Sequence, residues 1–204
     1  SSTYGTYKPI DSYVLTPNYK SVQVAAKNDV CNFSFITSVS NMFQKKNINM
    51  TISDTKSEIN QMVDLVKTTN EDNKIKLYIS CFTECPIVGK IDNHAILTEI
   101  MYYYHTHSKH IDNFCLSDTC GTLRFQDFKF IIDALIKNGV ELEQFGLHLH
   151  KQSNCDNVKN IIVYGMKNGI SQYDVSYMPE IGGCSVTMEN PPGNVGYETI
   201  YECL

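Results

Sequence analysis

Residues 113–150, NFCLSDTCGTLRFQDFKFIIDALIKNGVELEQFGLHLH, contain the unit that decides the fold. The short β-rich run Asn113–Leu116 is followed by the helical pattern of Phe125–Lys137, which Asn138-Gly139 ends as a helix stop. A second β-rich run, Phe145–His150, comes shortly afterwards. A strand, a helix and a further strand in this order are typical of a parallel α/β protein.

The same alternation extends in both directions from this unit. The other β-rich runs are Ser12–Leu15, Cys31–Ile36, Ile75–Cys81 and Gln172–Tyr177. The other helical patterns are Ser53–Lys67, which opens with a Ser/Asp cap, Asn93–Tyr104, and Val158–Lys167, which Asn168-Gly169 closes. A closed eight-fold barrel averages about 250 residues, so this pattern predicts either an open doubly wound sheet or a barrel short of about two units. We expect one domain over residues 13–204, after a flexible lead-in at 1–12.

Composition excludes several classes of protein. The 204 residues carry a formal net charge of −5, with 42% hydrophobic and 19% charged residues, which is too apolar for a disordered chain. The mild acidity and the single arginine, Arg124, argue against a nucleic-acid partner. No apolar run approaches the roughly 20 residues of a membrane span, and the first residues do not have the pattern of a signal peptide.

Eight cysteines are spread along the chain, at positions 31, 81, 85, 115, 120, 155, 184 and 203. The chain is too long for a small disulfide scaffold, so we expect reduced thiols in an intracellular compartment, most of them acting as small buried apolar residues. Cys81 and Cys85 could form a structural zinc site with His105 and His107. The alternative is that these histidines, near a helix end, face solvent.

His148 and His150 are the sharpest candidates for a functional site. Side chains alternate along a strand, so the two imidazoles point to one side, and Leu147 and Leu149 point to the other. Two imidazoles on one face form a natural pair of metal ligands, and the carboxyl end of a strand is where parallel α/β proteins place their sites. The alternative is two unrelated histidines near a strand end.

Two further segments carry suitable chemistry. The glycines of Ile181-Gly-Gly-Cys184 allow the backbone to approach a ligand, and Cys184 could transfer a proton or act as a nucleophile, although a plain turn is the alternative. Asn194, which follows Gly193, has an amide oxygen suited to a hard divalent ion. Asp118, within Leu116–Gly121, either orients a ligand or caps the next helix.

Six segments, in this order, resemble the 3-hydroxy-3-methylglutaryl-CoA lyase family, which are metal-dependent lyases with a (β/α)8 TIM barrel. The segments are Val14-Leu-Thr-Pro-Asn18; Phe43-Gln-Lys-Lys-Asn-Ile-Asn49; Tyr78-Ile-Ser-Cys81 with Cys85-Pro86 and Gly89-Lys90-Ile91; Ser117-Asp118-Thr119 with Gly121; His148-Leu-His150; and Gly182-Gly183-Cys184 with Gly193-Asn194. They look like strands 3 to 8 of that family and the loops that follow them. The resemblance therefore implies an α/β fold of the TIM-barrel type that is incomplete.

The resemblance also implies a site and a reaction. A divalent cation, magnesium or manganese, would be held by His148, His150 and Asn194. Cys184 would carry the catalytic thiol, and Asp118 would shape the site of an acyl-CoA substrate. The implied reaction is the retro-Claisen cleavage of 3-hydroxy-3-methylglutaryl-CoA to acetyl-CoA and acetoacetate. The family often works in mitochondria, and we leave the mitochondrion and the cytoplasm open.

Departures from the family pattern lead to a second hypothesis. The chain begins about two βα units after the family's Arg-Asp-Gly strand, and Arg124 falls in a later helix. Lys151 stands where the family usually has an aspartate, and the loop before Asn194 contains Pro191-Pro192. Loss of an electrostatic stabiliser commonly costs about 10²–10³ in rate.

The resemblance to the family and the departures from it lead to three hypotheses. The chain is a lyase completed by strands from elsewhere, or a degenerate homologue (a pseudoenzyme) that acts as a binding or structural subunit, or a small zinc-stabilised module without lyase ancestry. In the first two, we expect a second copy in a homo-oligomer or a partner chain to cover the open edges of the sheet, because unpaired edges promote aggregation.

Overall fold

A computed structural model of the chain describes residues 12–178 and 187–204. Its main sheet consists of β1 (Val14–Leu15), β2 (Asn32–Ser38), β3 (Lys74–Ser80), β6 (Asn113–Ser117), β7 (Phe145–His148) and β8 (Gln172–Asp174). All neighbouring strands are parallel, and their order in the sheet is their order in the sequence. A doubly wound sheet reverses its order at a switch point. The sheet is therefore the incomplete barrel, and that prediction is confirmed.

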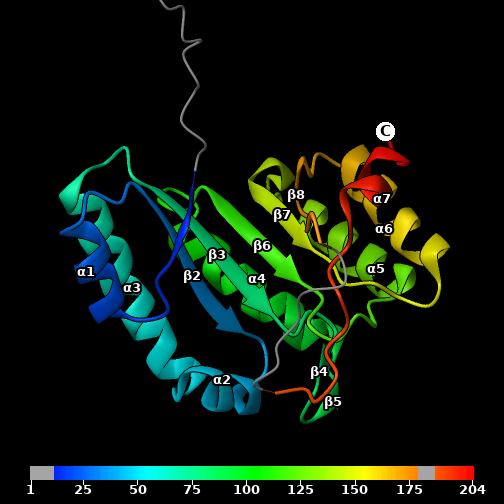
Figure 1. Cartoon of the computed structure of the whole chain (residues 1–204), viewed down its shortest axis with the longest axis horizontal. Coiled ribbons are helices and arrows are strands. Elements are labelled where there is room, and N and C mark those ends of the chain that lie inside the picture. Colours follow the sequence, from blue (N-terminus) through cyan, green and yellow to red (C-terminus); the bar gives the residue numbers. More distant parts are fainter. Residues whose placement is uncertain (1–11, 179–186) are drawn as a thin grey trace, which may run out of the picture.

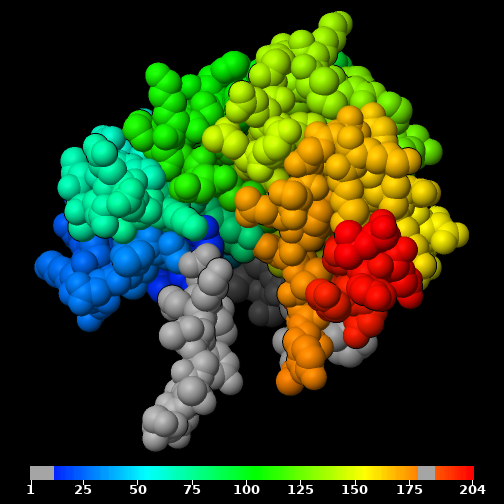
Figure 2. All heavy atoms as spheres, turned by 90° about the horizontal axis from the view of Figure 1, so that it is seen from above, coloured from blue at the N-terminus to red at the C-terminus, as the bar shows by residue number. Residues whose placement is uncertain are grey.

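Helices connect the strands and cover the outside of the curled sheet. They are α1 (Tyr19–Ala26), α2 (Asn41–Ile48), α3 (Ile52–Thr69), α4 (Asn93–His107), α5 (Phe125–Lys137), α6 (Cys155–Lys167) and the short α7 (Tyr197–Tyr201). A small antiparallel hairpin, β4 (Glu84–Cys85) and β5 (Gly89–Lys90), follows β3. Figure 1 shows α3, α4, α5 and α6 ranged along one side of the sheet. Seen from above in Figure 2, the blue N-terminal and the orange-red C-terminal segments stand at the two ends of an arch.

Alternation along the strands separates the core from the concave side. Phe33 and Phe35 of β2 and Leu77 of β3 are completely buried in the main hydrophobic core. The intervening residues, such as Ser34 and Tyr78, line a cavity on the concave side. Because successive side chains point to opposite faces, these strands direct apolar residues toward the helices and polar residues into the curl.

The predicted long helices are present, and their caps explain where they begin. Thr51, rather than the Ser/Asp pair, caps α3, because the Thr51 Oγ accepts the Asp54 N–H at 3.1 Å while the Asp54 carboxylate accepts the Thr51 N–H. The helix α5 has the predicted bounds, Phe125–Lys137. The helices α4 and α6 each extend three residues beyond their predicted patterns, to His107 and from Cys155.

Short elements account for most of the differences from the sequence prediction. Residues Phe43–Asn49, expected as part of a loop, fall largely in α2, which buries only Phe43 and Gln44 and so shows no helical apolar period. The strand β7 ends at His148, and β8 ends at Asp174. No helix within 12–178 or 187–204 is both long enough and apolar enough to span a bilayer.

Candidate functional site

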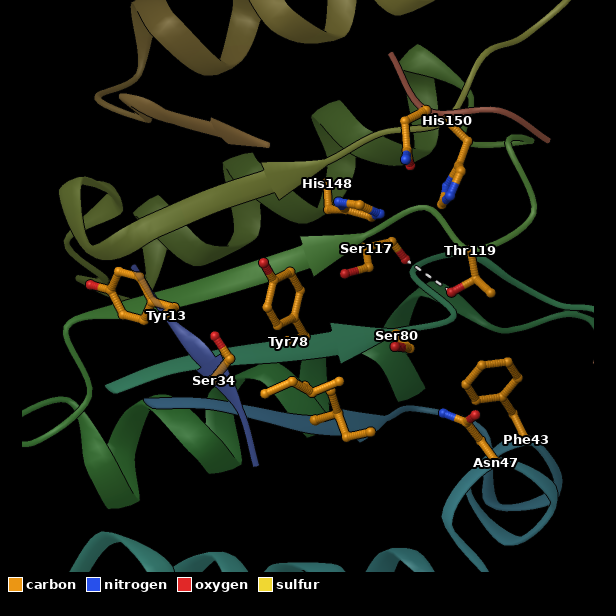
Figure 3. A pocket seen from close by; sticks show the side chains of 13 residues that line it. Tyr13, Ser34, Phe43, Asn47, Tyr78, Ser80, Ser117, Thr119, His148 and His150 are labelled. Carbon is orange, nitrogen blue, oxygen red and sulfur yellow. Dashed lines mark hydrogen bonds between the residues drawn. The ribbon is translucent and has the colours of Figure 1, made fainter. Parts of the chain in front are cut away.

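The concave side of the sheet contains a cavity of about 560 Å³ near the carboxyl ends of the strands. It is lined by Tyr13, Leu15, Ser34, Ile36, Phe43, Asn47, Tyr78, Ser80, Ser117, Thr119, His148, His150 and Asn194. In Figure 3, Tyr78, Ser117 and His148 project from successive strands into the same space, and His150 stands beyond the end of β7. The three metal ligands predicted from the sequence therefore line one cavity.

The two histidines reach the cavity from different kinds of backbone. His148 is the last residue of β7, whereas His150 forms an isolated antiparallel bridge with Asn194. Their ring centroids are 5.0 Å apart, with the ring planes at 84°. The bridge brings the C-terminal segment across the end of β7, so the amide of Asn194 and the two imidazoles converge although Asn194 is remote in the sequence.

His150 is buried and neutral at pH 7. Burial, together with His148, lowers its pKa to about 4, against the opposing effect of its hydrogen bond to the Asp118 backbone carbonyl. That bond joins Nδ1 to the carbonyl oxygen at 2.6 Å, so Nδ1 carries the proton and Nε2 carries the lone pair. The buried Nε2 has no hydrogen-bond partner among the described residues. A metal-ligating histidine commonly has this arrangement, in which a backbone carbonyl accepts the N–H of one ring nitrogen and the other ring nitrogen has no partner within the protein.

These donors fit a divalent cation, within the limits of the described residues. Two imidazoles and an amide oxygen suit manganese well, and the amide also suits magnesium. Within the described residues, 12–178 and 187–204, no group of three or more His, Cys, Asp and Glu side chains is arranged to hold a metal. The described donor set is therefore His148, His150 and Asn194.

Asp174 of β8 is a half-buried carboxylate, which the sequence analysis did not single out. Its Oδ1 accepts the Lys76 ammonium at 2.5 Å, and its Oδ2 accepts the Tyr78 hydroxyl at 2.7 Å and lies 3.5 Å from His148 Nδ1. Burial alone would raise the pKa of Asp174, but the contacts with His148, Lys76 and Tyr78 hold that pKa well below its usual range. Counting alternate residues along β8 could have placed this carboxylate on the concave face.

Asp118 acts within its own loop in this structure. Its fully buried carboxylate accepts the N–H groups of Thr122 and Leu123, at 3.0 and 3.2 Å, and the side-chain amide of Gln152. Burial raises its pKa to about 6 despite these hydrogen bonds. The helix α5 begins after Arg124 without a side-chain cap, so the helix-cap alternative is wrong. The carboxylate does not line the cavity; the backbone carbonyl of Asp118 is the group that contacts His150.

The remaining predicted groups lie elsewhere. Cys184 lies outside the described residues. Lys151 lines a separate hollow with Gln152 and Cys155, and it is not among the residues that line the cavity. Arg124 pairs with Asp127 at 3.1 Å at the start of α5.

The zinc alternative is wrong. Cys81 and Cys85 are buried beside Phe43, next to the β4–β5 hairpin at the carboxyl edge of the sheet. His105 and His107 lie in the last turn of α4, which runs from that edge back to the amino edge, a distance of roughly 20 Å for a helix of this length. Of these two histidines, both expected to face solvent, His105 is exposed and His107 is buried.

The fold and the cavity define a parallel α/β protein of the TIM-barrel type, with a polar site at the carboxyl ends of its strands. The chain belongs to the HMGL-like family, which its residues 9–185 match. This confirms the resemblance seen in the sequence and removes the hypothesis of an unrelated zinc module.

Individual relatives are similar over nearly the whole chain. Mitochondrial hydroxymethylglutaryl-CoA lyase of Gallus gallus is 26% identical over 191 residues, which cover 94% of this chain and 61% of that protein. The cytoplasmic 3-hydroxy-3-methylglutaryl-CoA lyase of Mus musculus is 25% identical, with 94% and 53% covered. The chain therefore spans about three-fifths or less of these relatives.

Solved structures show the same fold. An HMG-CoA lyase from Acinetobacter baumannii, in complex with coenzyme A and 3-methylmalate, matches with a TM-score of 0.79 and 21% identity, covering 97% of this chain and 61% of that chain. The hydroxymethylglutaryl-CoA lyase of Pseudomonas aeruginosa matches with a TM-score of 0.78 and 23% identity, covering 96% and 62%.

Proposed function

We propose that the chain acts in the divalent-metal-dependent cleavage of 3-hydroxy-3-methylglutaryl-CoA to acetyl-CoA and acetoacetate. The observation that carries the proposal is that His148, His150 and Asn194 line one cavity in a member of the HMGL-like family. The buried, unpartnered Nε2 of His150 supports a cation there.

The three ligands would hold magnesium or manganese through imidazole nitrogens and the amide oxygen. The bound cation would supply polarisation of the hydroxyl and carboxyl oxygens of the substrate. The protein's own contribution is to present imidazole nitrogens to the cation, and the lowered pKa of His150 favours the neutral form of that residue at pH 7. Polar groups along the concave face, such as Ser34, Ser80 and Ser117, would orient the acyl portion of the acyl-CoA.

Cleavage requires a base and an acid. A base removes the proton of the tertiary hydroxyl, and that carbon becomes the ketone carbon of acetoacetate. The electrons of the broken C–C bond form the enolate of acetyl-CoA, which takes up a proton at carbon. We assign this proton transfer to Cys184, and we give Asp118 the role of shaping the substrate site through its loop.

The direct test is acetyl-CoA release from 3-hydroxy-3-methylglutaryl-CoA with added manganese or magnesium. We expect Cys184→Ala to abolish release, whereas Cys31→Ala, at an exposed cysteine, should leave release unchanged. Release that Cys184→Ala does not alter would contradict the assignment of Cys184.

A degenerate homologue is the second candidate, favoured by the charge of the cavity. None of the described residues that line it is Lys or Arg, and Arg124 is engaged at α5. Without a cationic stabiliser for the enolate, the rate falls by about 10²–10³. A chain that binds manganese and an acyl-CoA in calorimetry but releases no acetyl-CoA would support a binding or structural subunit.

A partner at the open edges is part of both candidates. On β1, Val14 and Leu15 are 40% and 57% exposed, and Tyr177, beyond β8, is 97% exposed. We propose that a second copy or a partner chain covers these edges. Light scattering should give a mass above 23.2 kDa, and a stable monomer of that mass would contradict this proposal.

We also propose a reducing intracellular compartment, in which the described thiols stay unpaired.

A further inference from the structure

We infer that Asp174 is the positioning residue that holds His148 as a metal ligand, an inference that rests on the proposed cation site. The contact is between Asp174 Oδ2 and His148 Nδ1, which are 3.5 Å apart. Nδ1 and Nε2 lie on opposite sides of the imidazole ring. A carboxylate that faces Nδ1 favours the tautomer with its proton on Nδ1, and the lone pair of Nε2 is then directed away from Asp174.

His150 provides an internal comparison. Its Nδ1 contacts the Asp118 carbonyl oxygen at 2.6 Å, and its Nε2 is buried without a hydrogen-bond partner in the described chain. Both imidazoles thus have Nδ1 beside a protein oxygen acceptor. Ligating histidines commonly donate their second N–H to a backbone carbonyl or a carboxylate, which sets the tautomer and the ring orientation. Asp118 does this for His150 through its backbone carbonyl. The Asp174 carboxylate lies in the corresponding place beside Nδ1 of His148, at 3.5 Å, which is a charge contact longer than the hydrogen bond of His150.

Asp174 is itself held by side chains from two other strands. Lys76 and Tyr78 of β3 bind its two carboxylate oxygens, and Cys115 of β6 directs its thiol to Oδ2 at 3.7 Å. The Lys76 ammonium also lies 4.8 Å from the centroid of the Tyr78 ring. The side chains of Lys76 and Asp174 are only 11% and 24% exposed, so water contributes little to this arrangement.

The charge partners of Asp174 make Asp174→Asn a direct test of how the carboxylate acts on His148, because they determine how the new amide is oriented. Lys76 is only a donor, so it would select the amide oxygen of the new side chain. The NH₂ group would then face Tyr78 and His148. A donor at that position favours His148 with its proton on Nε2, which is the tautomer that cannot bind a cation through Nε2.

The first experiment is imidazole ¹⁵N NMR of the metal-free 204-residue chain. We expect the Nδ1–H tautomer of His148 in the wild type and the Nε2–H tautomer in Asp174→Asn. Asp174→Glu should retain the wild-type tautomer, because it keeps a carboxylate. A wild-type His148 with the proton on Nε2 would overturn the inference without any variant.

The second experiment is manganese binding, followed by the EPR signal of free Mn²⁺. Asp174→Asn should weaken binding by about 10- to 100-fold. Lys76→Met removes one of the contacts that hold Asp174 but keeps the carboxylate, so its effect on the tautomer and on manganese affinity should be smaller than that of Asp174→Asn. Equal effects of Lys76→Met and Asp174→Asn would show a merely structural role and overturn the inference.

The two proposals fail in different ways. A wild-type chain that binds no manganese would contradict the proposed cation site, while the NMR result would still decide whether Asp174 sets the tautomer. A wild-type chain that binds manganese as tightly as Asp174→Asn, with the same tautomer in both, would overturn the positioning role alone.

Discussion

His150 and Asn194 pair through their backbones in an isolated antiparallel bridge at the carboxyl end of β7. Two hydrogen bonds flank the bridge, from Lys151 N–H to the Gly193 carbonyl at 2.8 Å and from Val195 N–H to the Leu149 carbonyl at 3.1 Å. Short hydrogen bonds on both sides restrict the position of the two side chains that the bridge carries. We therefore expect that any change that displaces the backbone here also changes the site.

The close approach of Gly121 to this bridge gives the first prediction. Gly121 has a φ of +65°, and a Cβ there would lie 2.9 Å from the Lys151 carbonyl oxygen. Gly139 has a similar φ of +75° but open space around it. Gly139→Ala should cost about 1 kcal/mol of unfolding free energy from backbone strain, and Gly121→Ala about 1–3 kcal/mol more from the clash. Urea denaturation measures both, and equal losses would contradict the argument.

The assignment of the metal ligands leads to the second prediction. His150→Ala removes the nitrogen whose lone pair is unpartnered, so manganese affinity should fall at least about 10-fold. His110→Ala, at an exposed histidine outside the cavity, is the matched control and should bind manganese as the wild type does. Calorimetric titration would decide, and unchanged affinity in His150→Ala would exclude His150 as a ligand.

Asp118 should make stability fall as the pH rises. Its pKa in the native state is about 6 because of burial, against 3.8 ordinarily, so the native state keeps a proton that the unfolded state loses. The contribution of Asp118 to the free energy of unfolding should then decrease between about pH 4 and pH 6, by up to about 3 kcal/mol.

Denaturation at several pH values tests this for the wild type and for Asp118→Asn. The variant cannot ionise, so the difference in stability between the two proteins should change with pH across this window. A difference that stays constant from pH 4 to pH 7 would show that the Asp118 carboxyl does not titrate as expected.

The aromatic packing between β6 and β7 gives the fourth prediction. Phe114 is completely buried and stacks on Phe145 with ring centroids 5.5 Å apart. Phe114→Ala should cost about 3–5 kcal/mol of unfolding free energy, because it leaves a cavity in the core. Phe130→Ala, at a residue that is 41% exposed, should cost under about 1 kcal/mol in the same assay. A similar cost for both would place Phe114 outside the cooperative core.

The sequence predicted the strand and helix units well where the pattern was long. The helix α5 shows the reason, since its apolar residues Phe128, Ile131, Ile132 and Leu135 follow the helical period and are all buried. The sequence did not predict α2, which buries only Phe43 and Gln44. This helix is stabilised by its N-cap Ser40 and by the packing of Phe43 against Cys81 and Cys85. Tertiary contacts, and not local periodicity, stabilise that helix.

For the candidate site, the sequence indicated His148, His150 and Asn194, which line one cavity, whereas Asp174 could not be assigned a role. The partners of Asp174, Lys76 and Tyr78, lie on β3, nearly a hundred residues earlier in the chain. Nothing local to β8 indicates which cation or hydroxyl its carboxylate will meet.

By itself the sequence determined the succession of parallel βα units and the division of each strand into an apolar and a polar face, because both are local properties of the chain. Only the tertiary structure decided that His150 pairs with Asn194, that the Asp118 carboxylate binds its own loop, and that Asp174 contacts His148. These contacts arise because the curl of the sheet brings the inward side chains of different strands together, and the degree of curl is set by packing across the whole core.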